Sequence, residues 1–123
     1  MAHSDLNDLT QRLREFAGAR DWEQFHTPKN LAMALSVEVA ELAEHFQWLT
    51  PDEASSLKND PATVDALASE IADVAIYLLR LADVLDVDVA EAVRRKMASN
   101  EERFPSDLVR GRATLPEGRK ADG

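Results

Sequence analysis

Two pairs of acidic residues, each with a spacing of three, are the part of this 123-residue sequence best suited to do chemistry. Glu38 and Glu41 form the first pair, and Glu70 and Asp73 form the second. Residues three apart lie on one face of an α-helix, so each pair presents two carboxylates in the same direction. Carboxylates bind hard divalent cations through oxygen and also transfer protons. The spacing therefore indicates metal-dependent chemistry at these four residues.

The first pair does not lie on an ordinary solvated face. Glu38 falls inside the apolar stripe of its predicted helix, between Leu35 and Leu42. Burying an ionised carboxylate without a partner costs on the order of several kcal/mol, and neighbouring carboxylates repel one another. The basic residues nearest in sequence, Lys29 and Arg80, are not predicted to point inward. We therefore expect divalent cations to neutralise the four acids.

The composition narrows the choice of metal and partner. Cysteine is absent, which excludes disulfides, thiolate nucleophiles and cysteine-based zinc or iron–sulfur sites. We assign no role to His26 or His45, so oxygen ligands remain, and these favour Mg²⁺ with Mn²⁺ as the alternative. The 14 basic and 23 acidic residues give a net charge of −9. That balance argues against a nucleic-acid partner, but a metal can still hold a small anionic ligand.

The hydrophobic pattern favours a cytoplasmic globular protein. Hydrophobic residues make up 45% of the chain and charged residues 30%, which is enough apolar material for a packed core. No apolar run reaches the roughly 20 residues that span a bilayer, and the N-terminus lacks the pattern of a signal peptide. We therefore expect no membrane partner.

Proline, glycine and capping residues divide the chain into helices. All five prolines lie between periodic segments, and no glycine occurs from position 19 to position 110. The predicted helices run from Ser4 to about Gly18, from Pro28 to about Trp48, from Pro51 over a short segment, from Pro61 to about Leu85 and from Asp88 to Pro105. The sequence thus predicts an all-α, four-helix-bundle-like fold of five helices, one of them short.

The same pattern predicts one domain over residues 1–105. Residues 106–123 mix glycine, proline and both charges without periodicity, so we expect a flexible C-terminal tail. The fourth helix carries an apolar stripe, namely Leu67, Ile71, Val74, Leu78, Leu81 and Leu85. One side of the second helix is small and uncharged, namely Ala32, Ser36, Ala40, Ala43 and Gln47. A helix without a charged outer face suggests partner helices on both sides.

The acidic pairs and their flanking motifs resemble the MazG-like all-α nucleotide pyrophosphohydrolases, and most closely the dCTP pyrophosphatase branch. The motifs that carry the resemblance are Arg20-Asp21-Trp22-Glu23-Gln24-Phe25-His26, Phe46-Gln47-Trp48, Asp73-Val74-Ala75-Ile76-Tyr77-Leu78 and Lys96-Met97-x-x-Asn100. They extend over nearly all of the predicted ordered region. The resemblance implies a MazG-type helical bundle that assembles as a homodimer or homotetramer, with active sites built partly across subunits.

The implied reaction is Mg²⁺-dependent hydrolysis of a (deoxy)nucleoside triphosphate between the α and β phosphates, as nucleotide-pool house-cleaning. The products are the monophosphate and pyrophosphate, and dCTP or a modified dCTP is the implied substrate. Glu38, Glu41, Glu70 and Asp73 are then the metal ligands and catalytic residues. Which of these carboxylates accepts the proton of the attacking water stays open.

The resemblance also implies residues that bind the nucleotide. Trp22, Trp48 and Tyr77 match positions of the base and sugar pocket. Asn100 carries a donor and an acceptor that suit a pyrimidine edge, and Lys96 suits a phosphate. Leu13 departs from the mammalian dCTP-directed relatives, which carry a histidine near the base at this position, so the choice of base stays open.

Two further interpretations compete with this one. The chain is alternatively a pyrophosphohydrolase for another non-canonical nucleotide, or a non-catalytic helical module whose acidic face recruits a basic partner. Di-iron bundle proteins also place carboxylates inside helices, but they use Glu-x-x-His pairs. No histidine stands three residues after Glu38 or Glu70, so this third class is disfavoured.

Overall fold

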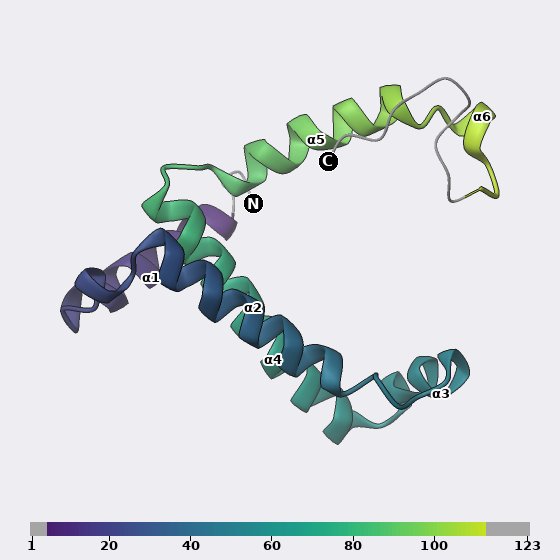
Figure 1. Ribbon diagram of the computed structural model, residues 1–123, viewed down its shortest axis with the longest axis horizontal. Coiled ribbons are helices and arrows are strands. Elements are labelled where there is room, and N and C mark those ends of the chain that lie inside the picture. Colours follow the sequence, from purple (N-terminus) through teal and green to yellow (C-terminus); the bar gives the residue numbers. More distant parts are fainter. Residues whose placement is uncertain (1–4, 113–123) are drawn as a thin grey trace. The chain divides into compact units, whose positions relative to one another are not determined.

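The computed structural model describes residues 5–112, which fall into two units divided between Val87 and Asp88. The first unit contains α1 (Asp5–Ala19), the 3-10 turn η1 (Glu23–Phe25), α2 (Pro28–Glu44), α3 (Pro51–Ser56), the 3-10 turn η2 (Leu57–Asn59) and α4 (Pro61–Val84) (Figure 1). The second contains α5 (Val89–Arg103) and α6 (Ser106–Val109). No strand occurs within residues 5–112, which confirms the all-α prediction for the described chain. None of the helices described is long and apolar enough to cross a membrane.

Side-chain caps begin the helices where the sequence predicts. Thr27 accepts a hydrogen bond from the backbone nitrogen of Asn30, at 3.2 Å, and Pro28 opens α2. Thr50 and Glu53 form a complete capping box at α3. The side chains of Asp60 and Asp88 cap α4 and α5, where they accept from the backbone nitrogens of Ala62 and Glu91. Because such a cap contributes about 1 kcal/mol, these local signals are strong enough to fix where these four helices start.

Helix α4 organises the first unit, because it packs against both α2 and α1. Figure 1 shows α2 and α4 lying side by side. The hydrophobic residues buried within the described chain are Ala17, Leu31, Leu79 and Ala82. They come from α1, α2 and α4, so these three helices share one small core.

The periodicity was a poor guide to which faces are buried. In the predicted stripe of α4, Ile71 is 55% exposed, and Leu78 and Leu85 are also exposed. The small, uncharged side of α2 is exposed as well. Helix α4 is apolar on more than one side, so apolar spacing alone does not select the face that meets α1 and α2. The first unit holds three long helices rather than four, so the predicted bundle is found only in part.

Two helix ends differ from the prediction. α2 ends at Glu44 rather than near Trp48, and residues 45–49 continue as turns. A sixth helix, α6, follows Pro105, where an irregular tail was predicted. Proline lacks a backbone N–H but fits the start of a helix, so Pro105 ends α5 while its carbonyl accepts from Leu108 and Val109. Residues 113–123 of the predicted tail lie outside the described residues.

Candidate functional site

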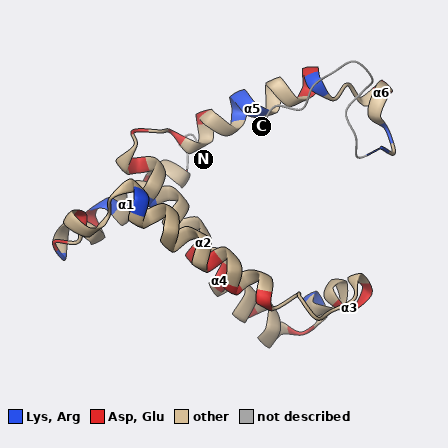
Figure 2. Cartoon of the chain, viewed as in Figure 1, with Lys and Arg blue, Asp and Glu red and all other residues tan. Residues whose placement is uncertain are grey.

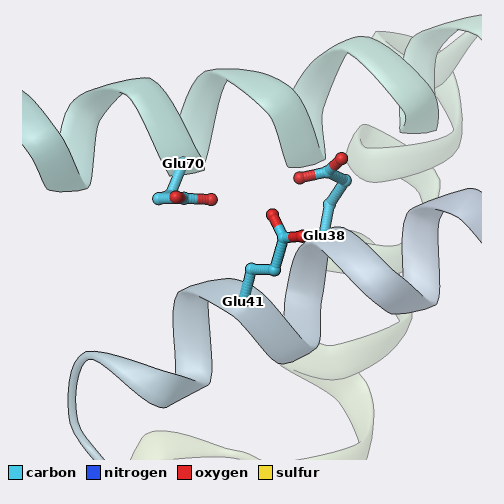
Figure 3. A group of neighbouring side chains, drawn as sticks. All are labelled: Glu38, Glu41 and Glu70. Carbon is cyan, nitrogen blue, oxygen red and sulfur yellow. The ribbon is translucent and has the colours of Figure 1, made fainter.

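Three of the four predicted acids meet between α2 and α4. Glu38 and Glu41 extend from α2 toward α4, and Glu70 extends from α4 toward them (Figure 3). Each residue offers a carboxylate oxygen such that these atoms all lie within 4.8 Å of one another. Figure 2 shows acidic residues on both helices. The i, i+3 spacing on α2 therefore delivers two carboxylates to one place, as the helical geometry requires.

Part of this carboxylate cluster, which we define as Glu38, Glu41 and Glu70, is shielded from water. Within residues 5–112, Glu38 Oε2 and Glu70 Oε2 are buried side-chain oxygens without a hydrogen-bond partner. Burial raises the pKa of Glu38, and the hydrogen bond to Glu41 and the charges of Glu41, Asp73 and Glu70 raise it further. His45 also lies near the cluster, with its Nε2 3.9 Å from Glu70 Oε1. The cluster thus holds more negative charge than the described side chains offset.

Asp73 lies beside the cluster rather than within it. It is half-buried on α4, one turn after Glu70, and its charge contributes to the raised pKa of Glu38. The fourth predicted ligand is therefore close enough to act on Glu38. The side chains present oxygen donors only, with two buried oxygens unsatisfied. This donor set fits Mg²⁺ or Mn²⁺ and does not match the histidine-containing set of a di-iron site.

A second feature is an aromatic cavity of about 230 Å³ between α1, η1 and α4. Its lining residues are Leu13, Phe16, Ala17, Trp22, His26, Ile76, Tyr77 and Arg80. The Trp22 and Phe16 rings meet edge to face, with centroids 5.7 Å apart. The structure thus brings together two of the three predicted aromatic residues, Trp22 and Tyr77.

Trp48 is not part of this aromatic cavity. It lies in the turns after α2, and its side chain is 87% exposed. The backbone explains the separation, because Trp22 precedes α2 whereas Trp48 follows it, and the helix between them spans about 25 Å. Within one chain Trp48 therefore lies away from this cavity, and its place in the base and sugar pocket stays a prediction.

Lys96 and Asn100 both lie on α5 in the second unit. They are four residues apart and so share a helical face. Lys96 is exposed, whereas Asn100 is half-buried and its Oδ1 accepts a hydrogen bond from Arg103 at 3.5 Å. Within its unit, this face presents one amine and one amide.

Sequence reasoning missed the role of Arg80. This residue is only 4% exposed, its Nη1 lies 3.0 Å from Asp83 Oδ2, and its Nε donates to His26 Nδ1 at 3.2 Å. The expectation that Arg80 does not point inward is therefore wrong. The residue spacing could have predicted the pairing of Arg80 with Asp83, because Arg80 stands three before it. Arg80 also stands seven after Asp73 and three after Tyr77. All of these positions are neighbours on a helix.

Comparison with known proteins agrees with the motifs. The sequence model of the MazG-like family matches residues 33–111. The dCTP pyrophosphatase 1 of Mus musculus is 46% identical over 117 residues, covering 92% of this chain and 69% of that protein. The protein of the same name from Homo sapiens is 45% identical with the same coverage.

A solved structure shares the fold. The crystal structure of a pyrophosphatase from Archaeoglobus fulgidus superposes with a TM-score of 0.74 at 46% identity, covering 85% of this chain and 96% of that chain. The resemblance predicted from the motifs is thereby confirmed. This chain belongs to the MazG-like family and has the all-helical fold of its pyrophosphatases.

Proposed function

We propose that this chain hydrolyses a nucleoside triphosphate, dCTP or a modified dCTP, to the monophosphate and pyrophosphate in a Mg²⁺-dependent reaction. The observation that carries the proposal is the carboxylate cluster, with its two buried and unsatisfied oxygens. The relatives named dCTP pyrophosphatase 1 support the choice of substrate. Removal of a base-damaged or surplus nucleotide from the pool is the corresponding physiological role.

Glu38, Glu41 and Glu70, together with Asp73, would hold the metal. A Mg²⁺ ion held by these carboxylates would supply positive charge to offset the triphosphate and would lower the pKa of a bound water. A carboxylate of the cluster accepts the proton of the attacking water. The remaining carboxylates would serve as metal ligands.

The aromatic cavity supports a place for the nucleoside. Tyr77 follows Glu70 by seven residues and Asp73 by four, which corresponds to about 10 Å and 6 Å along α4. The nucleoside end of the substrate therefore reaches Trp22 and Tyr77 while its phosphates lie at the acids. Aromatic stacking contributes about 1–3 kcal/mol per base with little selectivity. The family resemblance separately supports Lys96 as a phosphate contact and Asn100 as a base-edge contact.

We also propose that the chain works as a homodimer or homotetramer. Met33 and Val37 on α2 are both more than half exposed, as is Ile71 on α4. Small and uncharged residues continue the exposed face of α2. A second copy packed on α2 and α4 would remove these side chains from water and supply the missing bundle helices. Trp48 would then contribute to the nucleoside pocket of a neighbouring copy.

The test is pyrophosphate release from canonical and modified dNTPs, with and without Mg²⁺, with the monophosphate product identified by chromatography. Glu41→Gln and Asp73→Asn are expected to lose activity. Asp65→Asn is the matched control, because Asp65 is an exposed acid on α4 outside the cluster. Release from no nucleotide would reject the hydrolase and leave the acidic interaction module. Release from a nucleotide other than dCTP would retain the chemistry and reject the substrate.

A further inference from the structure

His45 ends α2 beside the carboxylate cluster. It is the C-cap of the helix and keeps helical backbone angles, with φ −65° and ψ −20°. It stands four residues after Glu41 and seven after Glu38, so it shares their face of α2. Its Nε2 lies 3.9 Å from Oε1 of Glu70, which belongs to α4. The imidazole of one helix therefore meets a carboxylate of the other.

The two oxygens of Glu70 have different surroundings. Oε1 lies near the imidazole, whereas Oε2 is buried and has no hydrogen-bond partner within the described chain. The last torsion of a glutamate side chain is broad and roughly two-fold, so the side chain itself does not select which oxygen is buried. A contact with one oxygen alone can make that selection, and His45 supplies such a contact.

His45 lies outside the group of potential metal ligands. That group consists of Glu38, Glu41 and Glu70, and within residues 5–112 no histidine nitrogen joins it. The separation of 3.9 Å exceeds a direct hydrogen bond and suits electrostatic attraction or a bridging water. Partners of this kind orient the ligands of a metal, and their removal typically weakens metal binding by about 10–100-fold.

We propose that His45 is a positioning residue for Glu70, which it holds through Oε1 so that Oε2 stays in the buried position and available to a metal ion. The inference rests on the proposed function, because it takes the carboxylate cluster as the metal site. It assigns His45 no contact with the nucleotide. His45 is thus expected to affect metal affinity and not the recognition of the base.

Metal binding without nucleotide tests this role, with Mn²⁺ as the probe and the free ion measured by electron paramagnetic resonance. His45→Leu removes the imidazole, and the dissociation constant for Mn²⁺ is expected to rise about tenfold. His45→Gln retains an N–H donor of similar reach and is expected to recover most of the affinity. Because His45 is exposed, both variants are expected to keep the fold.

Lys58→Leu is the control, because Lys58 is an exposed basic residue of η2 outside the cluster. This variant should bind Mn²⁺ as tightly as the wild type. A dissociation constant of His45→Leu equal to or below that of the wild type would overturn the inference. Equal weakening in His45→Leu and His45→Gln would also overturn it, because the effect would then not depend on an N–H donor.

Electron spin echo spectra of the bound Mn²⁺ separate positioning from direct ligation. The inference predicts no nitrogen coupling of a coordinated imidazole in the wild type, because His45 acts on Glu70 from outside the ligand group. A coupling of that strength, lost in His45→Gln, would make His45 a ligand and overturn its positioning role.

Steady-state hydrolysis of dCTP divides the effect between metal and nucleotide. In His45→Leu the Mg²⁺ concentration for half-maximal activity is expected to rise about tenfold. At saturating Mg²⁺ the KM for dCTP should stay within about twofold of the wild type. A KM raised about tenfold under that condition would overturn the inference by placing His45 at the nucleotide. Absence of hydrolysis by the wild type would instead reject the proposed function, while Mn²⁺ binding still tests His45.

Discussion

The guanidinium of Arg14 on α1 donates two hydrogen bonds to the carboxylate of Asp83 on α4, from Nε to Oδ2 at 2.9 Å and from Nη2 to Oδ1 at 2.6 Å. Asp83 also pairs with Arg80 at 3.0 Å. The carboxylate of Asp83 therefore pairs with two arginines, and it links α1 to α4. The same carboxylate holds Arg80 against His26, so a structural ion pair and the wall of the aromatic cavity depend on one residue.

Asp83→Asn is expected to lower the free energy of unfolding at pH 7 by about 2 kcal/mol, because hydrogen bonds to a charged group are lost and Arg80 keeps its buried charge. Hydrogen bonding from Arg14 chiefly lowers the pKa of Asp83 below its ordinary value of 3.8, although burial opposes this. The stabilisation is therefore present above that value and is lost as the pH falls through the lower folded pKa. Urea unfolding at pH 7 and pH 3 should show the difference between wild type and variant shrinking in acid. A difference that does not change with pH would contradict the ion pair.

Glu38→Gln is expected to raise the melting temperature in EDTA while reducing Mg²⁺-dependent hydrolysis by at least about 100-fold. The amide removes a negative charge from the carboxylate cluster, which relieves repulsion, and it is a weaker metal ligand. Because the folded pKa of Glu38 is raised, the metal-free wild type should gain stability as the pH falls through that pKa. Differential scanning fluorimetry across this pH range checks the sign. Asp65→Asn, matched in charge change but outside the cluster, should alter neither measurement.

Mg²⁺ is expected to stabilise the wild type, because a ligand that binds only the folded state raises its stability by mass action. The gain is about 2.7 kcal/mol at one hundred times the dissociation constant. The melting temperature should rise with Mg²⁺ concentration and return to its starting value after chelation. In the double variant Glu41→Gln, Glu70→Gln the rise should vanish. An equal rise in that variant would show that Mg²⁺ binds elsewhere.

Trp48→Ala is expected to change the free energy of unfolding of the single chain by less than about 0.5 kcal/mol, because the side chain is 87% exposed. Nucleotide affinity should nevertheless fall about tenfold, if Trp48 stacks in a neighbouring copy. Isothermal titration with dCMP, alongside urea unfolding, separates the two quantities. Losses of affinity and stability in equal measure would count against a binding role.

The proposed contribution of Trp48 to a neighbouring copy gives a separate expectation. A mixture of Trp48→Ala and Trp22→Ala chains should regain part of the affinity that each variant lacks alone, because some mixed sites contain both tryptophans. Size-exclusion chromatography with light scattering establishes the oligomer, and refolding the two variants together forms the mixture. No recovery in mixed oligomers would contradict a nucleoside site shared between Trp22 of one copy and Trp48 of another.

The sequence by itself determined the elements of this protein and their chemical content. Thr27, Thr50, Asp60 and Asp88 each carry the capping information for a helix within four residues, and prolines bar continuation. The two acids of α2 are likewise separated by less than one helical turn. Their carboxylates therefore lie on one face of α2, wherever that helix packs. Motifs over most of the chain also identified the family.

Only the tertiary structure decided which of several apolar faces is buried and which side chains meet across helices. Ile71 and Leu79 are equally suited to a core, yet Leu79 is buried and Ile71 is exposed, because α1 and α2 cover just part of α4. Arg80 turns inward because Asp83 and His26 satisfy its donors there, and His26 is 54 residues away. Trp22 and Trp48 separate because a straight helix stands between them. Burial and long-range pairing depend on how distant segments pack, and local residue spacing does not contain that information.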